Sequence, residues 1–233
     1  MENRPRNLAV ATLLAVALAG TALLSACAPA SKPKTNVPTA EMLAPSQVSE
    51  YKGQRLDSIT AFRENSIKGP QYVDIKKYRL VVDGLVSKPA SYSYDEVLTG
   101  FKHYSKVVRL DCVEGWSVNI LWEGPLVRDI IASSAPLPQA KVVIFHAVDG
   151  YSTSFPVEYM TGNDRIMAYK MNGVVIPPER GYPFMLVAED KWGYKWCKWI
   201  DRIEISSNAD YRGYWESRGY SNDGSLKKDF FSK

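Results

Sequence analysis

A single cysteine, Cys112, comes directly after a run of alternating residues at positions 106–110, and an acidic residue, a glycine and an aromatic residue follow it. The alternation predicts a strand and the glycine predicts a turn, so we expect Cys112 where a strand gives way to a loop. A thiolate in such a place can attack a substrate, bind a soft metal or form half of a disulfide. These three uses require different neighbours.

The rest of the chain has few residues that could support either a cysteine nucleophile or a metal site made by the protein alone. A cysteine nucleophile needs a proton acceptor, and the sequence holds only two histidines, His103 and His146. A tetrahedral metal site made by the protein alone needs about four Cys or His ligands at close spacing, and the sequence contains no CxxC and no HxxxH. Two interpretations stay open: a disulfide between Cys112 and Cys197, or a single thiolate bound to a metal whose other ligands come from an organic cofactor.

Composition and charge limit the classes of protein to which the chain could belong. The chain has 233 residues, of which 45% are hydrophobic, and this is enough for one domain with a sizeable core. Its formal net charge is +4, and the lysines and arginines are scattered along the sequence. The charge pattern therefore does not indicate a nucleic-acid-binding protein.

The N-terminus predicts export. Arg4 and Arg6 precede an apolar run at residues 8–24, and small residues lead directly to Cys27. This pattern resembles the lipobox of bacterial lipoproteins and predicts a signal peptide over residues 1–26 and a lipid on Cys27. A plain transmembrane anchor is the alternative, because about 17 apolar residues are near the minimum for a span. In both cases we expect the domain to be extracytoplasmic and anchored to a bacterial membrane.

The remaining sequence divides into a tether and a domain. Residues 27–50 are polar and rich in proline, which predicts a flexible tether without secondary structure. Within the expected domain at residues 51–233, a capping-box pattern at Ser93 and Glu96 and the prolines at 125 and 156 predict short helices. Asn-Gly at 172–173 predicts a hairpin, and the other strands are expected at 78–82, 106–110, 141–148, 184–187 and 199–205. The pattern predicts an α+β fold, a β-rich mixed sheet domain with short helices, and not a doubly wound sheet.

Several motifs occur in an order that is found in one family of enzymes. Residues 112–117 read Cys-Val-Glu-Gly-Trp-Ser, and Trp122 lies ten residues after the cysteine. Further matching segments are 78–86, 149–152, 171–173, 193–200 and 213–221. Together they resemble the molybdopterin-binding domain of the sulfite oxidase family. The resemblance is closer to its small bacterial branch, which includes the catalytic subunit of the periplasmic methionine sulfoxide reductase.

The resemblance implies that Cys112 is the thiolate ligand of a molybdenum atom that one molybdopterin also binds through its dithiolene sulfurs. It also implies which residues receive the pterin and the phosphate: Asn65, Ser66, Ile67, Cys112, His146, Ala147, Arg180, Trp196, Cys197 and Lys198. Lys195 is a second candidate for the phosphate. A solvated surface charge is the alternative for each lysine, and a small buried apolar residue is the alternative for Cys197.

Three features differ from the family pattern. Met185 stands where relatives often have an arginine, and Ala147 stands where the reductase branch tends to have a threonine. Arg4 and Arg6 are separated by a proline, so they do not form the twin-arginine signal that is common in exported proteins loaded with cofactor in the cytoplasm. These differences concern how the cofactor is held and how it reaches the exported chain.

The residues after the cysteine indicate the class of substrate. Sulfite oxidases have arginines shortly after the ligand, whereas this chain has Glu114 and Trp116. A carboxylate beside the metal would repel sulfite, so we expect oxygen-atom transfer from a neutral oxide such as a sulfoxide. In this interpretation Cys112, Glu114 and Trp116 form the reacting centre, with Glu114 tuning or relaying protons. Trp116 and Trp122 are expected to line the pocket, and simple core packing is the alternative for both.

Other functions stay open at this point. One is oxidation of sulfite, and another is a non-catalytic scaffold of the same fold in which Cys112 and Cys197 form a disulfide. The chain has no C-x-x-C-H motif for haem attachment. We therefore expect the electrons to come from a separate redox partner, such as a cytochrome or a membrane haem protein.

Overall fold

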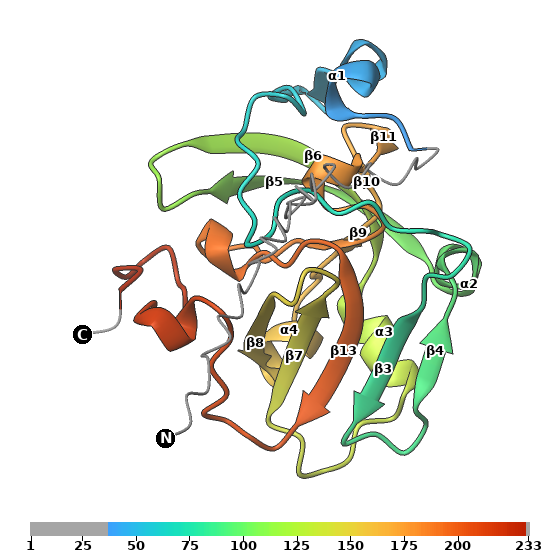
Figure 1. Ribbon diagram of the computed structural model, residues 1–233, viewed down its shortest axis with the longest axis vertical. Coiled ribbons are helices and arrows are strands. Elements are labelled where there is room, and N and C mark those ends of the chain that lie inside the picture. Colours follow the sequence, from blue (N-terminus) through green and yellow to red (C-terminus); the bar gives the residue numbers. More distant parts are fainter. Residues whose placement is uncertain (1–36, 232–233) are drawn as a thin grey trace, which may run out of the picture. The chain divides into compact units, whose positions relative to one another are not determined.

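The computed structural model describes residues 37–231, and Figure 1 shows the arrangement of their helices and strands. The predicted signal peptide over residues 1–26 and the predicted lipid on Cys27 lie outside this range. Within residues 37–231, no helix combines the length and the apolar character that a membrane span requires.

An antiparallel sheet of four strands carries Cys112. Its strand order is β11–β10–β6–β5, and the bounds are β5 His103–Asp111, β6 Ser117–Pro125, β10 Lys170–Met171 and β11 Val174–Val175. The two long strands form a hairpin that pairs from His103 opposite Pro125 to Asp111 opposite Ser117 (Figure 1). The strand predicted before Cys112 is confirmed, and so is the hairpin predicted at Asn172 and Gly173. The sequence did not reveal β6.

The second sheet has five strands in the order β4–β3–β13–β7–β8. Their bounds are β3 Leu80–Gly84, β4 Ala90–Tyr92, β7 Val142–Ala147, β8 Ser152–Pro156 and β13 Ile200–Ser206. β13 runs parallel to β3, whereas the other neighbours are antiparallel. The predicted β-rich mixed sheet is therefore confirmed.

The helices are short and cover the sheets. Within residues 37–231 the α-helices are α1 Ala40–Leu43, α2 Tyr94–Gly100, α3 Val127–Ser133 and α4 Val157–Thr161. Figure 1 shows α3 and α4 on one face of the five-stranded sheet. The predicted capping box is present, because Ser93 Oγ accepts a hydrogen bond from Glu96 N at 3.2 Å and Glu96 Oε2 accepts one from Ser93 N at 2.7 Å. The shorter elements are η1 Ala44–Ser46, η2 Pro178–Arg180, η3 Gly193–Lys195, η4 Glu216–Arg218, β1 Glu50–Tyr51, β2 Gln54–Arg55, β9 Met167–Ala168 and β12 Met185–Leu186.

The prediction that residues 27–50 form a tether without secondary structure is wrong for the part that begins at α1. Ala40 in α1 is only 1% exposed. The Gln47 side chain accepts hydrogen bonds from Ile59 N at 2.9 Å and from Asn172 Nδ2 at 3.2 Å. This segment is held by partners that are distant in the sequence, so local hydrophobic periodicity could not reveal it.

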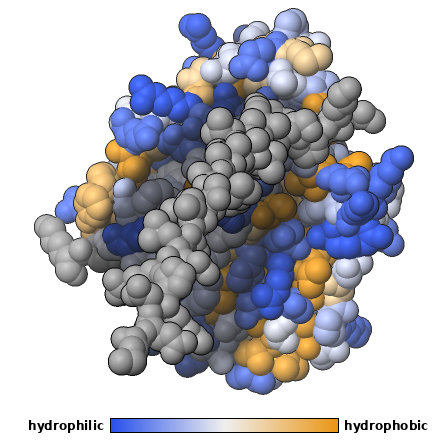
Figure 2. Space-filling model, viewed as in Figure 1, coloured by the Kyte–Doolittle hydropathy of each residue, from blue (hydrophilic) through white to orange (hydrophobic). Residues whose placement is uncertain are grey.

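The core lies between the sheets and under the short helices. Val118, Ile120 and Trp122 alternate along β6 with side chains that are almost fully buried, as a strand with one face toward the core requires. The ring centroids of Trp122 and Trp196 lie 5.6 Å apart, so Trp122 packs in the core, as its alternative interpretation stated. On the face drawn in Figure 2, hydrophilic residues are interspersed with smaller hydrophobic areas, as is usual for a folded domain.

Candidate functional site

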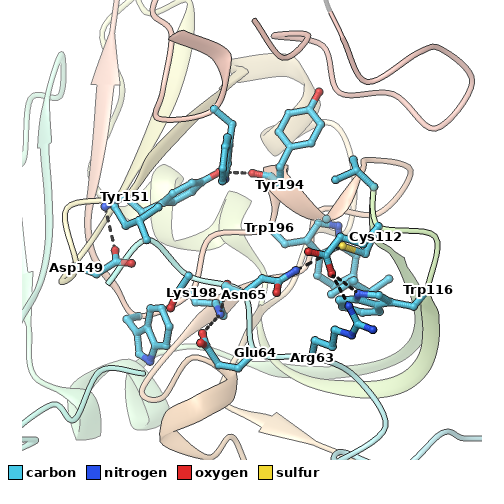
Figure 3. A pocket seen from close by; sticks show the side chains of 18 of the residues that line it. Arg63, Glu64, Asn65, Cys112, Trp116, Asp149, Tyr151, Tyr194, Trp196 and Lys198 are labelled. Atoms are coloured by element: carbon cyan, nitrogen blue, oxygen red, sulfur yellow. Dashed lines mark hydrogen bonds and ion pairs between the residues drawn. The ribbon is translucent and has the colours of Figure 1, made fainter. Parts of the chain in front are cut away.

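A cavity of about 440 Å³ lies at the tip of the β5–β6 hairpin, between residues 63–69 and residues 193–199. Pockets for small molecules and cofactors are commonly about 300–1,000 Å³, so the space suits a ligand of cofactor size. Several residues predicted from the sequence line it: Asn65, Ser66, Ile67, Cys112, Glu114, Trp116, Trp196 and Lys198. Figure 3 shows Cys112 and Trp116 on one side of this cavity and Asp149 and Tyr151 on the other.

The end of β5 positions Cys112. The chain turns directly after the strand, where Cys112 N donates to Trp116 O at 2.9 Å and Gly115 N donates to Cys112 O at 3.0 Å. Gly115 has a φ of +84°, a conformation that glycine adopts without strain. The Cys112 side chain is 8% exposed, and Asn65 Nδ2 lies 3.8 Å from its Sγ atom. The sulfur therefore borders the cavity with one amide donor directed toward it.

Burial raises the pKa of the Cys112 thiol, and the charge of Glu114 raises it further. Hydrogen bonds from backbone groups and from Asn65 oppose this shift without reversing it. The metal-free protein therefore holds a protonated thiol at neutral pH, and a metal that binds the sulfur must displace this proton. Cys112 is accordingly a poor unassisted nucleophile and a suitable ligand for a strongly binding soft metal.

Glu114 places a negative charge at the mouth of the cavity. Its Oε2 accepts a hydrogen bond from Trp116 Nε1 at 3.1 Å and lies 3.9 Å from Arg63 Nη1. The hydrogen bond from Trp116, followed by that from Asn65, lowers the pKa of Glu114, so the carboxylate is ionised at neutral pH. The Trp116 ring stacks on Phe62 with centroids 5.9 Å apart. These contacts hold the carboxylate beside the thiol.

Lys198 joins the two segments that border the cavity. Its Nζ donates to Glu64 Oε1 at 2.8 Å and to Asn65 O at 2.5 Å (Figure 3). Its side chain is 16% exposed, so the alternative of a solvated surface charge is wrong for Lys198. Burial lowers its pKa, and the neighbouring Glu64 carboxylate favours the charged form. The ammonium therefore supplies a positive charge within reach of an anionic group in the cavity.

The residues present fit a pterin cofactor with a phosphate. Ser66 Oγ is buried and has no hydrogen-bond partner among the described residues. Such an atom requires a partner, because a buried polar group without one is unfavourable. The cavity also offers the Lys198 ammonium for a phosphate and the rings of Trp116 and Trp196 beside the space for a flat heterocycle. The thiol of Cys112 adds a candidate soft metal ligand to this set.

Four predicted cofactor contacts do not line this cavity. His146 and Ala147 line a second pocket, where His146 Nε2 lies 2.9 Å from Glu204 Oε2. The Arg180 Nε donates to Ile59 O at 3.0 Å, so its guanidinium is engaged in the core. Cys197 is fully buried, because successive residues of an extended segment point to opposite sides and its neighbours at 196 and 198 face the cavity.

The predicted alternative of a disulfide is also corrected by the structure. Cys112 and Cys197 are both free and buried. Cys197 belongs to the core as a small apolar residue, and Cys112 borders the cavity. The scaffold interpretation therefore lacks the cross-link that it assumed.

Several lining residues were not predicted as parts of the site. The carboxylates of Glu64 and Asp149 border the cavity, and so do the aromatic rings of Tyr151, Tyr194, Trp215 and Tyr220. Most of these residues belong to sequence segments that carry the family resemblance. The sequence alone gave no signal that separates an aromatic ring facing a cavity from one packed in the core.

The comparisons with known proteins agree with this site. Residues 67–215 match the family described as the oxidoreductase molybdopterin binding domain. The chain is 32% identical over 152 residues to the "Uncharacterized oxidoreductase YuiH" of Bacillus subtilis, an alignment that covers 65% of this chain and 76% of the relative. It is 28% identical over 201 residues to the "Protein-methionine-sulfoxide reductase catalytic subunit MsrP" of Xanthomonas campestris, covering 76% of this chain and 62% of that relative.

A solved structure shares the fold. The sulfane dehydrogenase SoxCD from Paracoccus pantotrophus is similar with a TM-score of 0.59 and 24% sequence identity, covering 66% of this chain and 43% of that chain. The chain belongs to the oxidoreductase molybdopterin-binding domain family, which is the sulfite oxidase family that its motifs predicted. It is a molybdopterin-dependent oxidoreductase, and its cofactor contains molybdenum.

Proposed function

We propose that this chain is an extracytoplasmic, lipid-anchored molybdenum oxidoreductase that reduces a neutral oxide, such as a sulfoxide, by oxygen-atom transfer. The observation that carries the proposal is the position of the Glu114 carboxylate, which Trp116 Nε1 holds by a hydrogen bond of 3.1 Å beside Cys112 in the cavity lining. A fixed negative charge repels a sulfite dianion and leaves an uncharged substrate unaffected. The similarity to the Xanthomonas methionine sulfoxide reductase subunit supports the same direction of reaction.

Different residues of the chain would bind different parts of the cofactor. Cys112 would hold the molybdenum, with one molybdopterin dithiolene as the other sulfur donor, and the Asn65 amide would orient the Cys112 sulfur. Lys198 would receive the phosphate, and Ser66 Oγ would donate to or accept from the pterin. When bound, the cofactor supplies the two-electron chemistry of oxygen-atom transfer. Because the pKa of Glu114 is lowered, we assign this residue to charge discrimination and not to proton delivery.

A direct assay tests the choice of substrate. The molybdenum-loaded protein is mixed with a reduced dye and a sulfoxide, and in a second assay with sulfite and an oxidised acceptor. We expect turnover of the sulfoxide and little oxidation of sulfite. Rapid oxidation of sulfite without any reduction of sulfoxides would contradict the proposal and would favour the alternative function of a sulfite-oxidising enzyme.

The same proposal includes export of the chain with a lipid on Cys27 and a separate redox partner. The pattern that ends at Cys27 supports lipid attachment, and the missing haem motif supports electron delivery by a separate cytochrome or membrane haem protein. Incorporation of labelled palmitate into the full chain, and its loss in Cys27→Ser, would test the lipid. A haem absorption band in the purified chain would contradict the need for a separate haem partner.

A further inference from the structure

The last part of the chain forms one wall of the cavity. We call residues 207–231 the C-terminal strap; it follows β13 and runs beside β8, where Tyr214 N donates to Ser152 O at 2.9 Å (Figure 1). Two of its aromatic residues, Trp215 and Tyr220, line the cavity. The strap has little regular structure beyond η4 and must be held in place by specific contacts.

Lys195 provides the most deeply buried of these contacts. It ends η3, between the two cavity-lining residues Tyr194 and Trp196. Its Nζ donates to Glu216 Oε1 at 2.6 Å, to Asn222 O at 3.0 Å and, in β8, to Ser154 O at 2.7 Å. An ammonium has three donors, so every donor of this lysine is used. One side chain thus joins the cavity wall, the strap and the five-stranded sheet. The alternative of a solvated surface charge is wrong for Lys195.

Both members of the ion pair are completely removed from solvent, since the side chains of Lys195 and Glu216 are each 0% exposed. Thr153 Oγ1 donates to the same Glu216 oxygen at 2.6 Å. Gly224 lies so close that a Cβ at this position would overlap the Lys195 side chain. The strap therefore lies directly against the buried lysine.

Stability alone does not account for such a pair. Removing two charges from water is costly, and replacing a buried pair by well-packed apolar residues is often neutral or stabilising. A buried pair does, however, define one geometry, because any other position of the strap leaves a buried charge without its partner. Its position next to Tyr194 and Trp196 connects this geometry to the shape of the cavity.

We propose that the Lys195–Glu216 ion pair is a positioning device that fixes the C-terminal strap as the closing wall of the cofactor cavity. Trp215 and Tyr220 then keep the cofactor enclosed. Lys195 and Glu216 are positioning residues, because they act through the strap without bordering the cavity themselves. The inference concerns retention of the cofactor and does not depend on which oxide is reduced.

The double variant Lys195→Met/Glu216→Leu separates positioning from stability. We expect it to fold, since both charges are removed together. We expect it to release molybdenum on dilution about 10-fold faster than the unmodified holoenzyme, in the range found when residues that support metal ligands are changed. Trypsin should also cut the strap at Lys227 and Lys228 sooner. The measurements are molybdenum per chain against time and the mass of the first proteolytic fragments.

Lys228→Met is the matched control. Lys228 forms an exposed ion pair on the same strap, with Asp223 Oδ2 at 2.8 Å, and does not border the cavity. We expect this variant to retain molybdenum as the unmodified protein does. If the double variant retained molybdenum and resisted trypsin as well as the unmodified chain, the proposal would be wrong.

If the double variant fails to fold, hydrogen exchange of the unmodified protein tests the proposal instead. The backbone amides of Ser221, Gly224 and Leu226 in the strap are compared with those of β7, with and without bound molybdenum cofactor. We expect loss of the cofactor to accelerate exchange in the strap and to leave β7 unchanged. Equal exchange in the strap in both forms would contradict its role as the closing wall.

Discussion

Two ion pairs lie near the same cavity and differ in nearly every physical respect. Arg63 and Glu114 stand 3.9 Å apart at the mouth, with side chains 77% and 43% exposed. Lys195 and Glu216 stand 2.6 Å apart behind the part of the cavity wall that Tyr194, Trp196 and the C-terminal strap form, with side chains 0% exposed. The first pair is screened by water and salt, so it adds little to stability, although its carboxylate faces whatever enters. The second pair meets no substrate and can act only on the shape of the wall.

Under the two proposals made above for these pairs, one kind of interaction serves two purposes in this site. A charge at the mouth selects among molecules in solution, because they pass it while it remains ionised. A charge behind the wall restricts the conformation of the chain, because moving it away from its partner is costly. Substitutions at each pair, and at the thiol near the first pair, would separate these two purposes.

Replacing the sulfur of Cys112 tests the proposed metal ligand. Cys112→Ser keeps the size of the side chain but replaces a soft ligand by a weak hard one. We expect molybdenum-dependent activity to fall about 100-fold or more, since changes to groups that only support metal ligands already cost 10–100-fold. Metal analysis and turnover of the sulfoxide measure the effect. An unchanged molybdenum content with normal turnover would remove Cys112 from the centre of the site.

Removing one member of the buried pair tests the wall. Lys195→Met leaves the Glu216 carboxylate buried without its partner, and we expect the free energy of unfolding to fall by about 3–5 kcal/mol. Adding Glu216→Leu should restore most of this loss, so the two effects should be strongly non-additive. Urea unfolding of the single and double variants measures the coupling. Simple additivity would show that the pair acts as two independent residues.

Neutralising the carboxylate at the mouth tests discrimination by charge. Glu114→Gln keeps the side-chain size and removes the repulsion of anions. We expect kcat/KM for sulfite to rise about 5–10-fold relative to that for a sulfoxide, as the loss of roughly 1 kcal/mol of repulsion in a partly exposed site implies. The gain should shrink at high salt, because screening already weakens the repulsion in the unmodified chain. An unchanged ratio of the two substrates would contradict the assigned role.

The smallest effect is expected from the partner of this carboxylate. Arg63→Ala removes an exposed ion pair, and we expect the free energy of unfolding to change by less than about 1 kcal/mol. The unopposed charge of Glu114 should lower turnover of sulfite further and leave sulfoxide turnover nearly unchanged. Chemical unfolding and the two assays provide the measurements. A loss of stability similar to that of Lys195→Met would erase the contrast between mouth and wall.

Much of the fold could be predicted from local signals. The capping box at Ser93 and Glu96, the Asn172-Gly173 turn and the apolar run of β7 each act over a few residues, and each structure formed as expected. β6 was missed because Leu121 interrupts the alternation of Val118, Ile120 and Trp122 with polar residues and makes residues 120–122 a short continuous apolar run. The ordered structure around Gln47 was not predicted, because the residues that form hydrogen bonds with the Gln47 side chain are distant in the sequence.

The site was predictable where family motifs coincide with local geometry, and less so elsewhere. Asn65, Cys112 and Lys198 border the cavity as expected. His146 and Arg180 do not, because hydrogen bonds to Glu204 and to Ile59 direct their side chains elsewhere. The role of Lys195 could not be predicted from the sequence, since no local pattern distinguishes a lysine that is buried with Glu216 from a lysine that is exposed to water.

The hairpin that carries Cys112 also determines how insertions would affect the site. Side chains alternate along β5, so one residue inserted before Asp111 would either slip the pairing with β6 or turn the next side chain to the opposite face. The thiol would then point away from the ligand space even though no residue had been deleted. Lengthening the turn at residues 113–115 leaves the paired strands intact. Natural variation in chain length is therefore expected in that turn and not in the two long strands.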